Sequence, residues 1–213
     1  MEYKALINFC EKNDVALVAV SKTRSVKEIM ELYDQGQRVF GENRVQEWLD
    51  KKEKLPKDIE WHIIGHLQTN KVKYIIPEIA LIHSIDSIKL LSKVDQISQQ
   101  ENHITKVLLQ YKVAQEETKF GIDPELDKEI IEQCLQLNNI EVCGLMAMGT
   151  FTNDEDINRK EFAKLVSIFN RLKQNEFSKM DSFKLKSMGM SGDFQLAVEN
   201  GSNMIRVGSL LFK

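Results

Sequence analysis

The stretch VAVSKTRSVKE, residues 18–28, connects an apolar run to a helix start through a single lysine. The run that ends here, ALVAVS, has the length and the unbroken apolar character of a buried parallel strand. Ser25 and Glu28 follow with the S-x-x-E spacing of a capping box, which predicts that a helix begins there. Lys22 therefore stands where a buried strand gives way to a helix, and its chemistry depends on what the other strands place opposite it.

The same alternation of strand and helix continues along the chain. Seven more apolar runs of strand length follow: RVFGEN, EWHIIGHL, IALIHSI, ITKVLLQYKV, IEVCGLMAMG, FKLKSMGMS and NMIRVGSLLF. Helical patterns with a period of about 3.6 lie between them, for example SVKEIMELYDQG and DINRKEFAKLVSIFNRLKQ. Eight strands, each but the last followed by a helix or helical turn, favour an α/β fold, a (β/α)8 barrel of the TIM type. A doubly wound open sheet is the alternative.

Capping residues support these boundaries. Asp123 and Pro124 predict an N-cap followed by proline at the first helical position, and Gly36 and Gly201 stand where helices end. An extra amphipathic helix is expected before the first strand, from the apolar residues Leu6, Ile7, Phe9 and Cys10. No stretch has the composition of a linker, so we expect residues 1–213 to form a single domain.

Composition excludes several classes of partner. A formal net charge of −3 supplies no basic field for nucleic acid or anionic lipid. The apolar runs are well short of the roughly 18 residues that span a membrane, and the acidic start is unlike a secretory signal. The odd number of cysteines without a CxxC pair indicates reduced thiols. We expect a cytoplasmic monomer that binds neither nucleic acid nor membrane.

Glycine and polar residues cluster where the predicted strands end. In a barrel this edge carries the chemistry, and the candidate residues are Lys22, Asn43, His66, Met146, Ser191, Gly192, Arg206, Gly208 and Ser209. The segments GMSGDFQLAVENG and RVGS predict a phosphate site, because glycine amides and the free N–H groups of a helix start favour an anion. The simpler interpretation is that the glycines make a turn and Ser191 caps a helix.

The lysine at the first strand end has two interpretations. It could extend to solvent like most lysines. In a barrel mouth that faces a phosphate site, partial burial near Arg206 would instead lower the pKa of Lys22 and give a nucleophilic amine. Such a lysine suits a Schiff base with pyridoxal 5′-phosphate (PLP), or with a sugar phosphate in a class I aldolase.

The remaining candidates are weaker. His62 and His66 are four residues apart, but on a strand and its loop, and no cysteines lie nearby, so we expect no metal site. His83 is interpreted as a core-strand residue, and Trp48 and Trp61 as packing residues. The charged run EWLDKKEKLPKD, residues 47–58, is expected to be a solvated face.

The combination of AVSKTRS, FGENRVQE, WHIIGHLQTNK, FGI, GLMAMG and SMGMSGDFQLAVENGSNMIRVGSLLF closely resembles the YggS/PROSC family of pyridoxal phosphate homeostasis proteins. The resemblance runs from about residue 17 to residue 212, with the motifs in the family's order. The family is similar to the N-terminal barrel of fold-type III PLP enzymes such as alanine racemase. It implies PLP held as a Schiff base on Lys22.

The resemblance also implies roles for the other candidates. Arg206 would face the pyridine nitrogen, and the residues that would hold the phosphate are Ser191, Gly192, Gly208 and Ser209. Asn43 and His66 would border the cofactor, and Met146 would lie beneath it. Lys119 falls where the related racemases carry an arginine. Arg44 departs from the tyrosine that more often follows GEN in the family.

Members of this family are regarded as carriers or regulators of PLP and amino-acid pools, without established turnover, which makes PLP-dependent apo-enzymes conceivable partners. The alternative is a PLP-dependent racemase or lyase. Racemases of this type add a tyrosine base from a separate domain, and we expect none here because the chain stops after the eighth strand. Its own tyrosines are assigned to helices (Tyr3, Tyr33, Tyr74) and to strand five (Tyr111).

Overall fold

The computed structural model describes residues 2–114 and 120–212. Within these ranges eight parallel strands form a closed barrel in chain order, and β8 pairs with β1 to close it. The strands are β1 (Ala16–Val20), β2 (Val39–Glu42), β3 (Glu60–Ile63), β4 (Leu81–Ile85), β5 (Thr105–Gln110), β6 (Ile140–Met146), β7 (Leu185–Ser187) and β8 (Met204–Val207). The predicted (β/α)8 barrel is confirmed, and the pairing of β1 with β8 excludes the open sheet.

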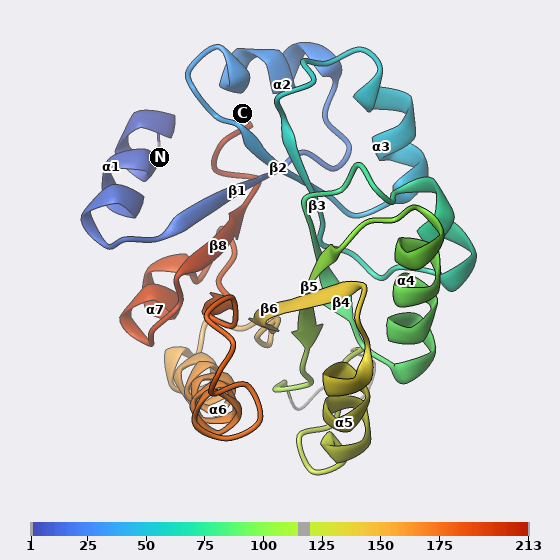
Figure 1. Cartoon of the computed structure of the whole chain (residues 1–213). Helices are drawn as coiled ribbons and strands as arrows, with labels where there is room; N and C mark the ends of the chain where they lie inside the picture. The colour runs from blue at the N-terminus through green and yellow to red at the C-terminus, as the bar shows by residue number, and fades with distance from the viewer. Residues whose placement is uncertain (1, 115–119, 213) are drawn as a thin grey trace.

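The helices lie around the outside of the barrel, as Figure 1 shows. In the described residues they are α1 (Tyr3–Lys12), α2 (Val26–Tyr33), α3 (Val45–Lys52), the 3-10 helix η1 (Thr69–Tyr74), α4 (Ile88–Gln100), α5 (Lys128–Gln136), α6 (Glu155–Gln174) and α7 (Phe194–Glu199). The expected extra helix before the first strand is α1, which buries Leu6 and Cys10. Among the described residues, every helix is too short or too polar to cross a bilayer.

The capping signals were correct at most boundaries. Ser25 and Glu28 form the reciprocal capping box at the start of α2. Gly36 and Gly201 have positive φ angles of 105° and 91° just past α2 and α7, a backbone region that glycine enters without strain.

The predicted helix start at Asp123 and Pro124 is wrong, because α5 begins at Lys128. The carboxylate of Asp123 accepts a hydrogen bond from the amide of Glu125, and its carbonyl accepts one from the amide of Leu126. These bonds close a turn instead of opening a helix. The true cap position, Asp127, uses its side chain for Tyr111 and Arg171.

Two apolar layers build the core. A large cluster between the strands and the helices includes Trp48 and Trp61, so their assignment as packing residues is confirmed. A smaller cluster consists of Val18, Val20, Ile64, Leu81, Leu108, Cys143, Met146 and Met204. It draws one or two side chains from each of six of the eight strands or their ends, so we assign it to the barrel interior. The interior is therefore packed, and polar groups that enter it must find partners.

Candidate cofactor site

The order of strands around the barrel places the predicted site residues side by side. Strands β6, β7, β8, β1, β2 and β3 are consecutive neighbours. The candidate residues lie at or just beyond the carboxyl ends of these six strands. Because all the strands are parallel, these ends meet at one rim of the barrel.

Lys22 lies two residues beyond Val20, in the turn between β1 and α2. Val18 and Val20 belong to the inner cluster, and side chains two residues apart share a face of a strand. Lys22 thus continues the alternation of Val18 and Val20, whose side chains face the barrel interior. The expected partial burial of Lys22 is wrong for this structure, where the residue is exposed because the strand ends two residues before it.

The loops after β7 and β8 touch each other. The amide of Gly208 donates to Oγ of Ser191 at 3.2 Å, across seventeen residues of sequence. A Cβ built on Gly192 would meet no atom within 4 Å, so the space beside this backbone is open. A hydroxyl, an amide and open space are therefore combined at the place where the sequence predicts a phosphate.

The helix after this loop contributes less than the sequence indicated. The amides of Asp193 and Phe194 both donate to the carbonyl of Met190, and Asp193 accepts in return from the amide of Met190. These two amides at the start of α7 are engaged within the turn. They are not among the free N–H groups that the sequence predicted there.

Arg206 is buried in the barrel, with 4% of its surface exposed. Its Nη1 donates to Oγ of Ser187 at 2.6 Å, and its Nη2 donates to the carbonyl of Ala147 at 2.9 Å. Burial lowers the pKa of Arg206 to about 10, which still leaves it a cation at neutral pH. A guanidinium has five N–H donors, so three remain for another acceptor.

A chain of hydrogen bonds leads from Arg206 through the barrel. Nδ1 of His83 lies 3.1 Å from Oγ of Ser187, and Nε2 of His83 lies 3.0 Å from Nδ1 of His62. All three side chains are buried. His83 lies on a core strand, as predicted, but its hydrogen bonds to Ser187 and His62 were not predicted from the sequence. The available signal was spacing, because His62 and His83 stand two residues from Ile64 and Leu81 of the inner cluster.

Acid is expected to destabilise the protein through these two histidines. Burial lowers the pKa of His62 from 6.5 to about 4, and the pKa of His83 is also lowered, mainly by burial. As pH falls below 6.5, the unfolded chain binds protons that the folded chain does not, so stability is lost. Between pH 7 and pH 5 the free energy of unfolding should fall by roughly 2 kcal/mol for His62 alone.

Urea unfolding at both pH values, with wild type and with His62→Gln, measures this effect. The variant should lose about that part of the pH dependence, because glutamine does not titrate. An identical pH dependence in both proteins would contradict the assignment.

The loops after β2 and β3 form the wall of the candidate cofactor site that lies opposite the loops after β7 and β8. A Cβ on Gly65 would lie 2.5 Å from the carbonyl oxygen of Asn43, so the two loops are in backbone contact. His66 is partly exposed, with Nδ1 3.1 Å from Oδ2 of Asp86 and its ring stacked on Phe120 at 4.2 Å between centroids.

The other predicted wall residues divide into three cases. Met146 is fully buried in the inner cluster. Arg44 is exposed at the N-cap position of α3. Lys119 lies outside the described residues.

A buried ion-pair network lies under the turn that carries Lys22. Nζ of Lys51 donates to the carbonyl of Ser21 at 2.8 Å, to Oε1 of Glu42 at 2.8 Å and to Oε1 of Glu47 at 2.7 Å. The hydroxyl of Ser21 donates to Glu42 at 2.6 Å, and the amide of Thr23 donates to Glu47.

The network corrects the assignment of residues 47–58 as a solvated face, because Lys51 is only 7% exposed. Burial raises the pKa of Glu42, and Lys51 and Ser21 oppose that rise. The contacts fix the backbone on both sides of Lys22.

Other reactive groups are placed away from this rim. Cys10, Cys134 and Cys143 are buried and free, and burial raises the pKa of each thiol. Within the described residues, no three His, Cys, Asp or Glu side chains gather in a way that could hold a metal ion.

Comparison with known proteins gives a consistent result. Residues 2–213 match the family described as Alanine racemase, N-terminal domain. A pyridoxal phosphate homeostasis protein of Aquifex aeolicus is 43% identical over 203 residues, which cover 94% of this chain and 87% of that protein. The human protein of the same name is 39% identical, with 92% of this chain and 75% of the relative covered.

Solved structures agree. PipY of Synechococcus elongatus, with PLP bound, superposes with a TM-score of 0.89 at 34% identity and 99% coverage of both chains. An alanine racemase of Clostridium difficile has a TM-score of 0.79 at 15% identity, covering 59% of that enzyme, which shows a shared fold alone. The chain belongs to the pyridoxal phosphate homeostasis proteins, within the alanine racemase N-terminal domain family.

Proposed function

We propose that this protein binds PLP at the carboxyl end of its barrel, covalently through Lys22, and acts as a carrier and regulator of cellular PLP. The observation that carries the proposal is Arg206, a buried cation that spends only two of its five donors on described acceptors. Buried donors are nearly always hydrogen-bonded to an acceptor. The pyridine nitrogen of PLP is such an acceptor. Relatives that carry the homeostasis name and the PLP-bound PipY structure support the same ligand.

The opposite end of the cofactor also fits. Phosphate is a strong acceptor for amides and hydroxyls, and the Gly208 amide now donates to the Ser191 hydroxyl. A phosphate oxygen can accept from both groups, with Gly192 leaving room beside it. Asn43, His66 and Ser209 would complete the border of the site, and Met146 would form its floor.

The arginine bears on whether the protein is an enzyme. PLP supplies an electron sink that is strongest when its ring nitrogen is protonated. Arg206 can only donate, and it stays charged at neutral pH. It would therefore hold the ring in place while keeping a proton off the nitrogen, which weakens the electron sink but does not by itself decide whether the protein turns over a substrate.

A racemase or lyase is the second candidate, favoured only by the shared fold. The tyrosines do not support it. The hydroxyl groups of Tyr3, Tyr33 and Tyr111 donate to Gln37, Asp58 and Asp127. Tyr74 lies at the end of η1, with Lys71 and Lys73 over its ring.

The two functions are distinguished by incubating the PLP-loaded protein with L- and D-amino acids in deuterated water. We expect little α-deuterium and no racemisation. Turnover of about 1 s⁻¹ or more with any amino acid, the ordinary range for enzymes, would contradict the carrier function. Transfer of bound PLP to a PLP-dependent apo-enzyme faster than from free PLP at equal concentration would support it.

We further propose that the protein is a cytoplasmic monomer and that apo-enzymes of this kind are its partners. Three buried thiols without a disulfide suit a reducing compartment. Sedimentation of the loaded protein alone and with an apo-enzyme measures both the monomer and any complex.

Ser191→Ala is expected to weaken PLP binding by about 1–2 kcal/mol, the cost of one lost hydrogen bond. Gly208→Val should weaken it far more. A Cβ on Gly208 would already lie 3.1 Å from the carbonyl oxygen of Val20, so the larger side chain must displace either the β1 end or the phosphate.

Equilibrium titration with PLP measures both variants, and urea unfolding of the apo-proteins separates a lost contact from a damaged fold. Equal and negligible effects on binding would place the phosphate elsewhere.

A further inference from the structure

The amino end of the barrel, opposite the candidate cofactor site, holds a second cavity. Its volume is about 590 Å³, within the ordinary range of small-molecule sites. Its lining comes from the first residues of the strands, among them Val39, Leu81 and Met204, which give it an apolar floor. No residue of the candidate cofactor site lines it.

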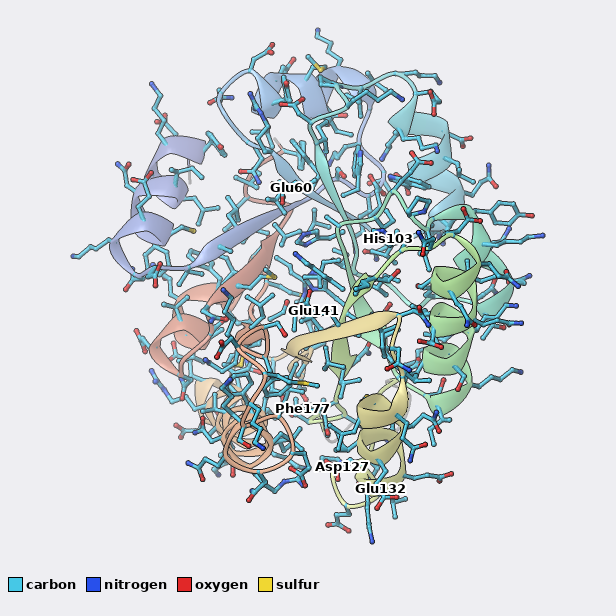
Figure 2. The ribbon with its side chains drawn as sticks, in the orientation of Figure 1. Glu60, His103, Asp127, Glu132, Glu141 and Phe177 are labelled. Atoms are coloured by element: carbon cyan, nitrogen blue, oxygen red, sulfur yellow. The ribbon has the colours of Figure 1, made fainter. Side chains whose placement is uncertain are left out.

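Charged side chains of both signs surround this amino-end cavity: Glu60, Lys106, Glu141, Asp181 and Lys184. Figure 2 shows Glu60 of β3 and Glu141 of β6 near the centre of the view along the barrel. None of the five forms an ion pair with a residue that the structure describes. The cavity thus offers both carboxylates and ammonium groups to a molecule of mixed charge.

His62 also lines the cavity, although it is only 5% exposed. Its Nδ1 is engaged by His83, and no described residue forms a hydrogen bond with its Nε2. A ring nitrogen that has no hydrogen bond to a described residue and belongs to a side chain lining a cavity is a group that a ligand can satisfy.

We infer the proton positions along the hydrogen-bond chain from its charged end. Arg206 can only donate, so Oγ of Ser187 accepts from it, and we assign the hydroxyl hydrogen of Ser187 to Nδ1 of His83. Nε2 of His83 then carries the proton and donates to Nδ1 of His62. The single proton of neutral His62 is left on Nε2, as a donor for the cavity.

We propose that this cavity is a binding site for a small zwitterion with an apolar side chain. The ligand carboxylate accepts from Nε2 of His62 between Lys106 and Lys184, its ammonium group faces Glu60 and Glu141, and its apolar part covers Leu81 and Met204. A neutral donor that meets a carboxylate polarises the bonds behind it. A ligand in the cavity therefore changes the polarisation of the hydrogen bond between Ser187 and Arg206.

The test uses L-leucine as the probe and the ring nitrogen resonances of His62 as the readout. Borohydride treatment first leaves no cofactor carbonyl to react with the amine. Leucine should shift the Nε2 resonance of His62 saturably. 4-Methylpentanoate and 3-methylbutylamine, which each lack one charge, should bind at least about tenfold more weakly, since a charged hydrogen bond is worth about 1.5 kcal/mol or more.

Ala16→Leu fills the cavity from an exposed strand start and should abolish the shift. Lys128→Gln, on the outer surface of α5, is the matched control and should leave it intact. No saturable shift with millimolar leucine, an unchanged shift in Ala16→Leu, or equal binding of the amine alone would overturn the proposal.

The link to Arg206 rests on the proposed PLP function and has its own readout. In the untreated protein, 4-methylpentanoate, which has no amine to react with PLP, should shift the visible band only when used at concentrations that also shift His62. If the protein did not bind PLP, the visible band would be absent, but the shift of the His62 resonance by the ligand would still be observed. A His62 shift with an unmoved band would overturn the link alone.

Discussion

Replacing Lys22 by alanine is expected to remove the visible absorption band of the purified, PLP-loaded protein. The side chain follows the interior face of β1 and is the candidate for the covalent bond to PLP, and alanine has no amine to form it. The variant should still bind some PLP through Arg206 and the Ser191–Gly208 pair. Mass spectrometry after borohydride reduction should find PLP on the peptide that contains Lys22 in wild type and on no peptide in the variant.

The matched control is Lys27→Ala, an exposed lysine on α2 close in sequence. It should keep the band and the modified peptide. A Lys22→Ala protein that carried PLP mainly on another lysine would show that the covalent site is misassigned.

Replacing Lys51 by methionine is expected to cost about 3–5 kcal/mol of stability, the usual penalty for removing one partner of a buried ion pair. The change keeps an unbranched apolar chain of similar length but leaves Glu42, fully buried, without its cation. The Ser21 carbonyl also loses a donor. Urea unfolding at neutral pH measures the loss.

Lys57→Met tests the specificity of this effect, because Lys57 forms an exposed pair with Glu53. Such surface pairs contribute about 0–1 kcal/mol. Adding Glu42→Gln to Lys51→Met should recover part of the stability, because the uncompensated charge is gone. A loss below about 1 kcal/mol in Lys51→Met would show that water reaches Glu42.

Sequence reasoning could predict the fold and the rim because both depend on local patterns. Only a few chain topologies accommodate eight strands with helices between them. In a barrel, the carboxyl ends of all the strands lie at one edge. The positions of Lys22, Asn43, Arg206 and Gly208 follow from that rule.

The chain of histidines could not be predicted in the same way. His83 meets Ser187 across 104 residues of sequence. Their contact depends on the relative register of β4 and β7, which no local pattern encodes. Spacing within each strand indicates that a residue faces inward, but it does not indicate which inward residue it meets.

The burial of Lys51 was not predicted because its local sequence pattern is misleading. Its sequence neighbours are charged, so its own segment resembles a solvated face, and only the packing of α3 against β2 buries it beside Glu42. The helix start at Asp123 shows a third limit. The Asp-Pro pair occurs in turns as well as at helix starts. Whether the helix begins there depends on distant contacts, here those of Asp127 with Tyr111 and Arg171.

The closure of the barrel between β1 and β8 has a consequence for synthesis on the ribosome. Lys22 follows the first strand, whereas Arg206 belongs to the eighth and Gly208 directly follows it, and the pairing of Val18 with Arg206 joins the two strands. A growing chain makes the lysine long before the arginine, and strand pairs so distant in sequence form late. Nascent chains arrested before β8 leaves the exit tunnel should not retain PLP, so the proposed attachment to Lys22 would require a finished barrel.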